Sequence, residues 1–180
     1  MRENLFRGKR RDNGEWVYGS LFVGFKKSYI CPEAIAMYNF DGALCLGGFV
    51  EVSPESVGQY TGLHDATKWE NLPEKEQQEF LRIHKKEDWN GKKIFEGDIV
   101  KADNGKYSSV SVVKFGEYYP KMFYAMLDMF NPGIPHLNAN GFYAATTKHE
   151  DMILFKSRYF EVIGNIHDNK SLLNNQEAGE

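Results

Sequence analysis

Apolar and polar positions alternate in short runs along most of this chain, a pattern typical of β-strands. Residues Trp16–Val23 (WVYGSLFV) are apolar on both faces, so we expect a strand that is central or covered by a second layer or subunit. Asn13-Gly14 and Asp41-Gly42 favour tight turns between strands. Further short strands are predicted at 28–31, 49–52, 57–60, 95–100, 110–115, 142–147 and 159–166.

One segment has helical spacing instead, and we expect a helix at about 71–88 with a thin apolar stripe. Asn71 is placed to cap its first turn, and Glu74 stands three residues on as the reciprocal capping partner. Asn90-Gly91 is predicted to end the helix. The thin stripe predicts that the helix packs by one narrow edge.

Glycines stand on the apolar faces of two predicted strands. Gly97 lies in GKKIFEGDIV and Gly164 lies in FEVIGNI. A glycine weakens a strand unless the backbone must bend or another chain must approach closely. Small barrels need such corners to close. Asp98, beside Gly97, can accept hydrogen bonds from nearby amides and hold the bend. We therefore interpret this glycine and aspartate as structural rather than catalytic.

Composition and charge narrow the class of protein. The chain has 180 residues, of which 42% are hydrophobic and 14% aromatic, in keeping with β structure. The net charge of −3 predicts no global basic field for nucleic acid or an anionic membrane. No apolar run approaches a membrane span, and the polar start resembles no signal peptide, so we expect a cytoplasmic protein. In the cytoplasm Cys31 and Cys45 would both be reduced. The alternative is a disulfide between them across a hairpin.

Five pieces of sequence, in order along the chain, together carry a family resemblance. They are FRGKR at 6–10, GEWVYGSL at 14–21, VSPESVGQYTGL at 52–63, GKKIFEGDIV at 91–100 and FEVIGNIHDN at 160–169. With them the chain resembles the YopX family of phage and prophage proteins. The resemblance implies a mainly β fold (α+β at most) with an SH3-like barrel, additional antiparallel strands and a phage or prophage origin. It carries over no catalytic residue, because the family is functionally uncharacterised.

The chain departs from the family pattern in one place. In the family, Tyr-Thr-Gly-Leu passes almost directly into Asn-Gly-Lys-Lys, whereas here a long segment intervenes and carries the predicted helix. We therefore expect one YopX-like domain at 1–174 with a helical insertion at 65–90, followed by a disordered tail at 175–180.

Catalytic and metal-binding motifs are missing from the sequence. It has no HExxH or Cys/His zinc spacing, no P-loop, no GxGxxG and no GxSxG. The five histidines are scattered, and separate surface histidines are favoured over a metal site. We therefore expect no enzyme activity, no cofactor and no metal.

A binding surface is the better functional candidate. Basic residues and tyrosines of a barrel could contact the backbone and bases of single-stranded nucleic acid. The alternatives are a solvated basic start and aromatics that pack in the core or at a subunit interface. We predict a non-enzymatic accessory protein that binds a phage or host macromolecule or assembles with itself, and alternatively a nucleic-acid-binding factor in phage replication or regulation. The candidate surface residues are Arg7, Lys9, Arg10, Arg11, Lys92, Lys93, Tyr118 and Tyr119.

Overall fold

Two compact units, residues 1–62 and 63–180, make up the chain. The computed structural model describes residues 4–24, 26–32, 37–40, 43–46, 48–103, 108–118, 139–146, 152–153 and 160–174. The described residues are mainly β, as predicted. The single domain over 1–174 stays a prediction, and the expected tail at 175–180 lies outside the described residues.

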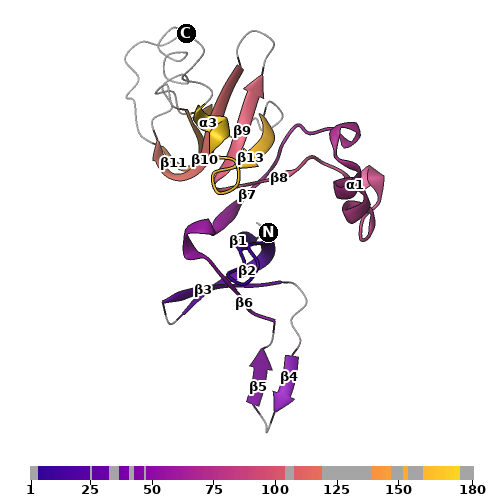
Figure 1. The fold of residues 1–180 in the computed structure, drawn as a ribbon, viewed down its shortest axis with the longest axis vertical. Helices are drawn as coiled ribbons and strands as arrows, with labels where there is room; N and C mark the ends of the chain where they lie inside the picture. The colour runs from indigo at the N-terminus through magenta and orange to yellow at the C-terminus, as the bar shows by residue number, and fades with distance from the viewer. Residues whose placement is uncertain are drawn as a thin grey trace. The chain divides into compact units, whose positions relative to one another are not determined.

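The first unit is built on one antiparallel sheet (Figure 1). Its strands follow the order β6-β3-β2-β1-β7, and β7 continues into the second unit, where β8 is the next strand in the order. The strands are β1 (Phe6–Lys9), β2 (Trp16–Gly24), β3 (Lys27–Cys31), β6 (Val50–Val52), β7 (Gly58–His64) and β8 (Lys93–Phe95). The predicted strand at 16–23 is therefore central, with β1 on one side and β3 on the other.

A separate hairpin follows β3 in the chain. It consists of β4 (Met37–Phe40) and β5 (Ala43–Leu46), with Phe40 opposite Ala43. The two strands form their own two-stranded sheet. This pairing confirms the predicted hairpin, while Asp41 and Gly42 themselves lie outside the described residues.

The first unit approaches closure without becoming a barrel. An isolated bridge joins Arg10 to Val52, so the chain after β1 returns to β6 at the far edge of the sheet. Ile30 and Val52 are fully buried, and a Cβ on Gly8 would lie 2.9 Å from the side chain of Val52. The strands of the described residues form no closed barrel, so the SH3-like barrel expected from the resemblance is not confirmed.

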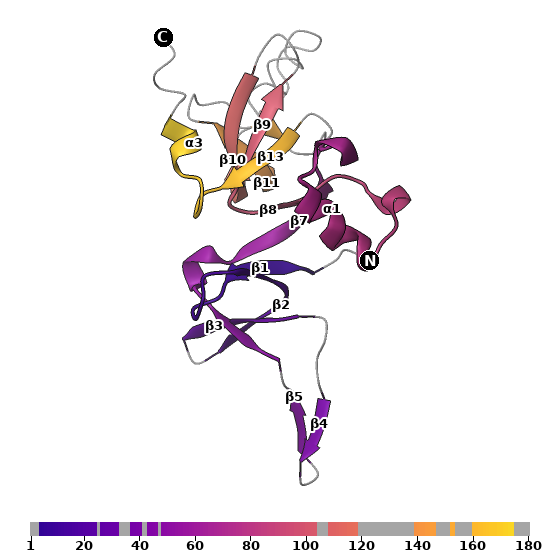
Figure 2. The same cartoon turned by 45° about the vertical axis from the view of Figure 1, so that its right-hand side comes forward.

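The second unit contains a five-stranded antiparallel sheet in the order β12-β11-β10-β9-β13 (Figure 2). Ile94, Val100, Val113, Ala144 and Phe160 form its buried core. The strands are β9 (Asp98–Asp103), β10 (Ser108–Tyr118), β11 (Ala139–Thr146), β12 (Met152–Ile153) and β13 (Phe160–Asn165), and a one-turn helix α3 (Ser171–Asn174) follows. The described residues also contain three 3₁₀ turns, η1 (Pro54–Ser56), η2 (Trp69–Asn71) and η3 (Lys86–Asp88).

The predicted strand at 95–100 is in fact two strands joined by a turn. β8 ends at Phe95, β9 begins at Asp98, and Gly97 has a φ of +82°, which favours glycine. Asp98 Oδ2 accepts the Phe95 N–H at 2.7 Å, which confirms the structural interpretation of Asp98. At Gly164 the register of β13 against β9 shifts, and a Cβ there would lie 2.6 Å from Asn169 Oδ1. Both glycines therefore serve backbone bends or close approaches, as predicted.

The predicted helix at 71–88 is shorter than expected. α1 runs over Glu74–Leu81, and Pro73 rather than Asn71 occupies its N-cap, without a side-chain hydrogen bond. The early end has a tertiary cause. In a continuous helix, residues 80 and 89 would lie about 13 Å apart along the axis. Here the Phe80 and Trp89 ring centroids are 5.2 Å apart, so the chain must turn back after α1. None of the helices in the described ranges is long and apolar enough to cross a membrane.

Candidate functional site

The basic residues of β1 pack against an aromatic ring. The Arg7 guanidinium lies 4.7 Å from the centroid of the Trp16 ring, and Lys9 Nζ lies 5.6 Å from it. Strand pairing explains the contact, because Lys9 is directly opposite Trp16 and Arg7 is opposite Tyr18. Arg7 is only 7% exposed. The alternative of a solvated, frayed start is therefore wrong for Arg7.

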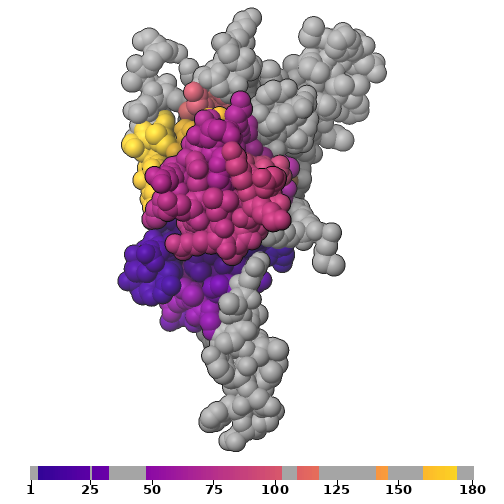
Figure 3. Space-filling view, turned by 90° about the vertical axis from the view of Figure 1, so that its right-hand side faces the viewer, coloured from indigo at the N-terminus to yellow at the C-terminus, as the bar shows by residue number. Residues whose placement is uncertain are grey.

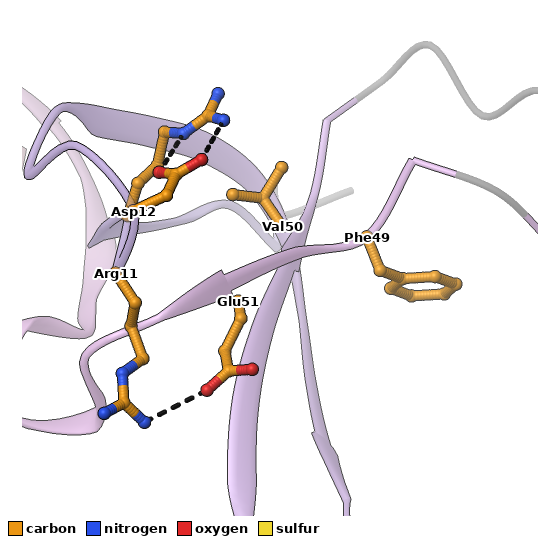
Figure 4. Close-up of a pocket in the computed structure, with 6 residues that line it drawn as sticks. Arg11, Asp12, Phe49, Val50 and Glu51 are labelled. Carbon is orange, nitrogen blue, oxygen red and sulfur yellow. Dashed lines mark hydrogen bonds and ion pairs between the residues drawn. The ribbon is translucent and has the colours of Figure 1, made fainter.

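The next two arginines form ion pairs beside an open hollow of about 400 Å³ (Figure 4). Arg10 and Asp12 approach to 2.7 Å, and Arg11 and Glu51 to 3.0 Å. Lys27 Nζ also lies 2.8 Å from Glu51, so this carboxylate contacts two cations. The hollow is lined by Arg10, Arg11, Asp12, Phe49, Val50 and Glu51.

These pairs shift the ionisation of both carboxyl groups. The hydrogen bond from Lys27 lowers the pKa of Glu51, and Arg11 acts in the same direction. The hydrogen bond from Arg10 lowers the pKa of Asp12. Residues 1–62 contain seven basic and seven acidic side chains. The cations of the first unit are thus matched by carboxylates, and the unit has no net positive charge to attract phosphate.

Among the described residues of the first unit, three exposed aromatic side chains, Tyr18, Phe22 and Phe49, form what is called here the aromatic strip. Tyr18 and Phe22 are four residues apart on β2, so they share a face of the sheet. The Phe22 and Phe49 ring centroids are 5.6 Å apart. The three side chains are 47%, 53% and 39% exposed. Exposed apolar side chains gathered on one face of a soluble protein commonly mark an interaction site.

In the second unit, Asp65 holds three chain segments together. Its Oδ1 accepts the N–H groups of Thr67 at 3.0 Å and Lys92 at 2.7 Å. Its Oδ2 accepts the Val162 N–H at 2.8 Å and the Thr67 hydroxyl at 2.6 Å. Gly91 completes the arrangement, because its φ is +93° and a Cβ there would lie 2.2 Å from the Asp65 carbonyl oxygen. The buried carboxylate is therefore a structural centre, which sequence reasoning did not identify.

Aromatic rings form the core of the segment at 65–90. The ring centroids of Trp69, Phe80 and Trp89 lie 5.2 to 5.9 Å apart in edge-to-face arrangements. Trp89 Nε1 donates to the Thr67 carbonyl oxygen at 2.9 Å, which ties the rings to the loop held by Asp65. In Figure 3 this segment faces the viewer as one continuous magenta-to-pink surface. The predicted insertion thus contains a cluster of half-buried aromatic rings.

A model of the YopX protein family matches residues 86–174. This part of the chain belongs to the YopX family. Neither a curated protein nor a solved structure matches the chain. The YopX match begins at η3 and includes every strand from β8 to β13 together with the helix α3.

The YopX match covers only part of the predicted resemblance. It includes Gly97, Gly164 and two of the residues bound by Asp65, namely Lys92 and Val162. Asp65 itself lies before the matched range. The pieces quoted at 6–10, 14–21 and 52–63 also lie before it, so their resemblance to the YopX family stays a prediction.

The predicted surface residues are distributed over both units of the chain. Arg7, Lys9, Arg10 and Arg11 lie together in the first unit, on β1 and directly after it. Lys92 and Lys93 lie in the second unit, where Lys92 Nζ is 2.9 Å from Glu76 and Lys93 is exposed. One positive strip formed by both groups stays a prediction. The Tyr118 side chain and the whole of Tyr119 lie outside the described residues.

Two further features of the described residues, a small hollow and a buried thiol, are weaker candidate sites. An open hollow of about 150 Å³ in the second unit is lined by Thr67, Asn71, Lys92, Glu161, Val162 and Ile163. Within the described part of the chain, no group of three or more His, Cys, Asp or Glu side chains is placed to hold a metal ion. Cys31 is a free, buried thiol, so the alternative Cys31–Cys45 disulfide is absent. The aromatic strip is the strongest candidate for a binding site. The sequence indicated only that the strand at 16–23 is apolar on both faces.

Proposed function

We propose that this YopX-family protein is a phage- or prophage-encoded accessory protein that binds another macromolecule through the aromatic strip and catalyses no reaction. The observation that carries the proposal is the exposure of Tyr18, Phe22 and Phe49 on one sheet face. Aromatic side chains are enriched in protein interfaces because they bury large areas at a low cost in conformational entropy. The family membership supports the phage or prophage origin.

The charges of the first unit favour a protein partner over nucleic acid. Arg10, Arg11 and Lys27 already contact carboxylates. Nucleic-acid affinity depends mainly on cations that neutralise phosphates. A surface whose cations are paired internally, with aromatic rings beside them, is better suited to an interface that has an apolar centre and a polar rim.

The proposal also covers the barrel type of the first unit and the cellular location of the protein. We propose that the first unit is a variant of the SH3-like barrel, supported by the Arg10–Val52 bridge between its outer strands. We also propose a cytoplasmic location, supported by the free thiol of Cys31.

A comparison of two single variants tests the binding role of the strip. Phe22→Ser removes an exposed ring of the strip, and Ile83→Ser removes an 81% exposed apolar side chain of the second unit. Tagged wild-type and variant proteins are used to capture partners from phage-carrying host cells, and each captured protein is purified for titration calorimetry. We expect Phe22→Ser to weaken direct binding at least tenfold and Ile83→Ser to leave it unchanged. Equal binding by all three proteins would contradict the proposal.

A second candidate function, nucleic-acid binding, is supported by the stacking of Arg7 and Lys9 on Trp16. Fluorescence anisotropy of labelled single- and double-stranded DNA and RNA tests it at low and moderate salt. The triple variant Lys9→Ala, Arg10→Ala, Arg11→Ala should weaken binding for all sequences and flatten its salt dependence. Arg7 is kept because it is buried. Absence of binding at low salt, where electrostatic attraction is strongest, would exclude this function.

A further inference from the structure

The β4–β5 hairpin is an apolar element with little support of its own. Its strands read MYNF and ALCL, so seven of its eight strand residues are apolar or aromatic. Among the described strands, β4 and β5 are hydrogen-bonded only to each other. An isolated two-stranded hairpin is marginally stable at best in water. An apolar hairpin of this kind requires a surface that covers it.

The hairpin is attached close to the aromatic strip. Only residues 47–49 separate β5 from β6, and the last of them is Phe49, a member of the strip. Three residues of extended chain span about 10 Å at most. One unit therefore presents two apolar elements joined by a short tether.

The aromatic strip stays exposed within one chain. Tyr18 and Phe22 remain about half exposed in the chain that carries the hairpin. A second copy offers the same pair of elements, and a twofold axis would place each hairpin on the strip of the other copy. Acidic and basic side chains balance in residues 1–62, so two such units do not repel each other through net charge.

We propose that the partner of the aromatic strip is a second copy of this chain, whose β4–β5 hairpin lies on Tyr18, Phe22 and Phe49 in a reciprocal, twofold dimer. The proposal rests on the binding role of the strip and names its occupant. It assigns the hairpin a role in assembly and makes the dimer interface self-complementary.

Sedimentation velocity over a concentration series is the first test, and it uses the full chain. The wild type and the control Ile83→Ser are expected to sediment as dimers. Phe22→Ser and the hairpin variant Leu44→Ser are expected to raise the dimer dissociation constant at least tenfold. Circular dichroism verifies that each variant is folded. A wild type that is monomeric at every concentration would overturn the proposal.

Cross-linking identifies the contact directly. Phe22→Cys places a thiol on the strip, and the native Cys45 supplies one on β5, while Cys31 is buried. A short bis-maleimide reagent is expected to yield covalent dimers joined between Cys45 and position 22. Adding Cys45→Ser should abolish them, and Ile83→Cys should give none. A cross-link between position 22 and Cys45 within one chain, or no cross-link between them, would overturn the proposal.

The two proposals fail in different ways. If the wild type is monomeric but Phe22→Ser still loses a captured protein that Ile83→Ser retains, the strip binds a different partner and only the dimer is wrong. If Phe22→Ser changes neither capture nor sedimentation, the binding role of the strip is wrong as well.

Discussion

The two units of this protein use their polar and apolar side chains in opposite ways. In the second unit, apolar residues from five segments form a closed core, and the buried carboxylate of Asp65 accepts hydrogen bonds from three segments. In the first unit, three aromatic side chains remain exposed, and the carboxylates of Asp12 and Glu51 pair with cations at the surface.

This difference indicates that the second unit holds the groups that stabilise the fold, whereas the first unit holds the surface proposed for binding. A buried carboxylate with four donors stabilises the native state because removing it leaves part-buried amides without acceptors. Exposed aromatic rings contribute little until a partner covers them. The YopX match lies wholly in the second unit, whereas the surface proposed for binding lies in the first. The comparison predicts large stability effects in one unit and small ones in the other.

Removal of the Asp65 carboxylate should have the largest effect. Asp65→Ala leaves the N–H groups of Thr67, Lys92 and Val162 without their acceptor. Since each donor left unsatisfied costs about 1–3 kcal/mol when buried, and these three are part-buried, we expect a loss of about 3–5 kcal/mol in the free energy of unfolding. Urea denaturation measures it. Asp12→Ala, at a solvent-exposed ion pair, should cost far less. Equal losses at the two sites would invalidate the comparison.

Two glycines with similar backbone angles should respond differently to alanine. Gly91 and Gly14 have φ of +93° and +74°, but a Cβ at Gly91 would lie 2.2 Å from the Asp65 carbonyl oxygen, whereas Gly14 has open space. Gly14→Ala carries only the left-handed backbone penalty of about 1–2 kcal/mol. Gly91→Ala adds a backbone clash and should cost about 3 kcal/mol or more. Thermal unfolding of the pair measures the difference, and equal midpoints would argue against the close approach.

Substitution in the aromatic strip should barely change the stability of the dissociated chain. Phe22 is more than half exposed, so Phe22→Ser should alter the free energy of unfolding by no more than about 0.5 kcal/mol when measured at concentrations where the protein is monomeric. The same variant should have its main effect on association. A loss of several kcal/mol in the free energy of unfolding under these conditions would show that Phe22 packs in the core of the first unit. The two units would then no longer differ in the way described above.

The smallest effect concerns pH. Hydrogen bonds from Lys27 and Arg11 lower the pKa of Glu51 in the folded state. Their stabilisation is present above the unfolded pKa, near the ordinary value of 4.5, and is lost as pH falls through the lowered folded pKa. Glu51→Gln should therefore lower the thermal midpoint at neutral pH and approach the wild type in acid. High salt should diminish the difference at neutral pH. A constant difference at all pH values would show that charge is not its cause.

Local signals in the sequence predicted much of the β structure. The central strand at 16–23, the hairpin at Asp41-Gly42 and the structural pair Gly97 and Asp98 are all found in the structure. Each depends on residues that are close in sequence, such as side-chain alternation, turn chemistry and a carboxylate that reaches an amide three residues away. Periodicity and turn propensity report these features directly.

Tertiary structure decided the features that depend on distant residues. α1 ends at Leu81 because Trp89 packs back on Phe80, which overrides the helical spacing read from the sequence. Arg7 is buried against Trp16 across two strands, although an N-terminal basic cluster normally indicates a solvated segment.

For the whole protein, the sequence determined the class of fold, the family and the bends at glycine, because these arise from side-chain patterning and backbone freedom within a few residues. Only the tertiary structure revealed Asp65 as a hydrogen-bonding centre and the aromatic strip as an exposed surface. Asp65 and Val162 are 97 positions apart in the chain, and no local pattern can indicate that a carboxylate will meet an amide so distant. Exposure likewise depends on which other segments cover a face, and it is decided only when the chain has folded.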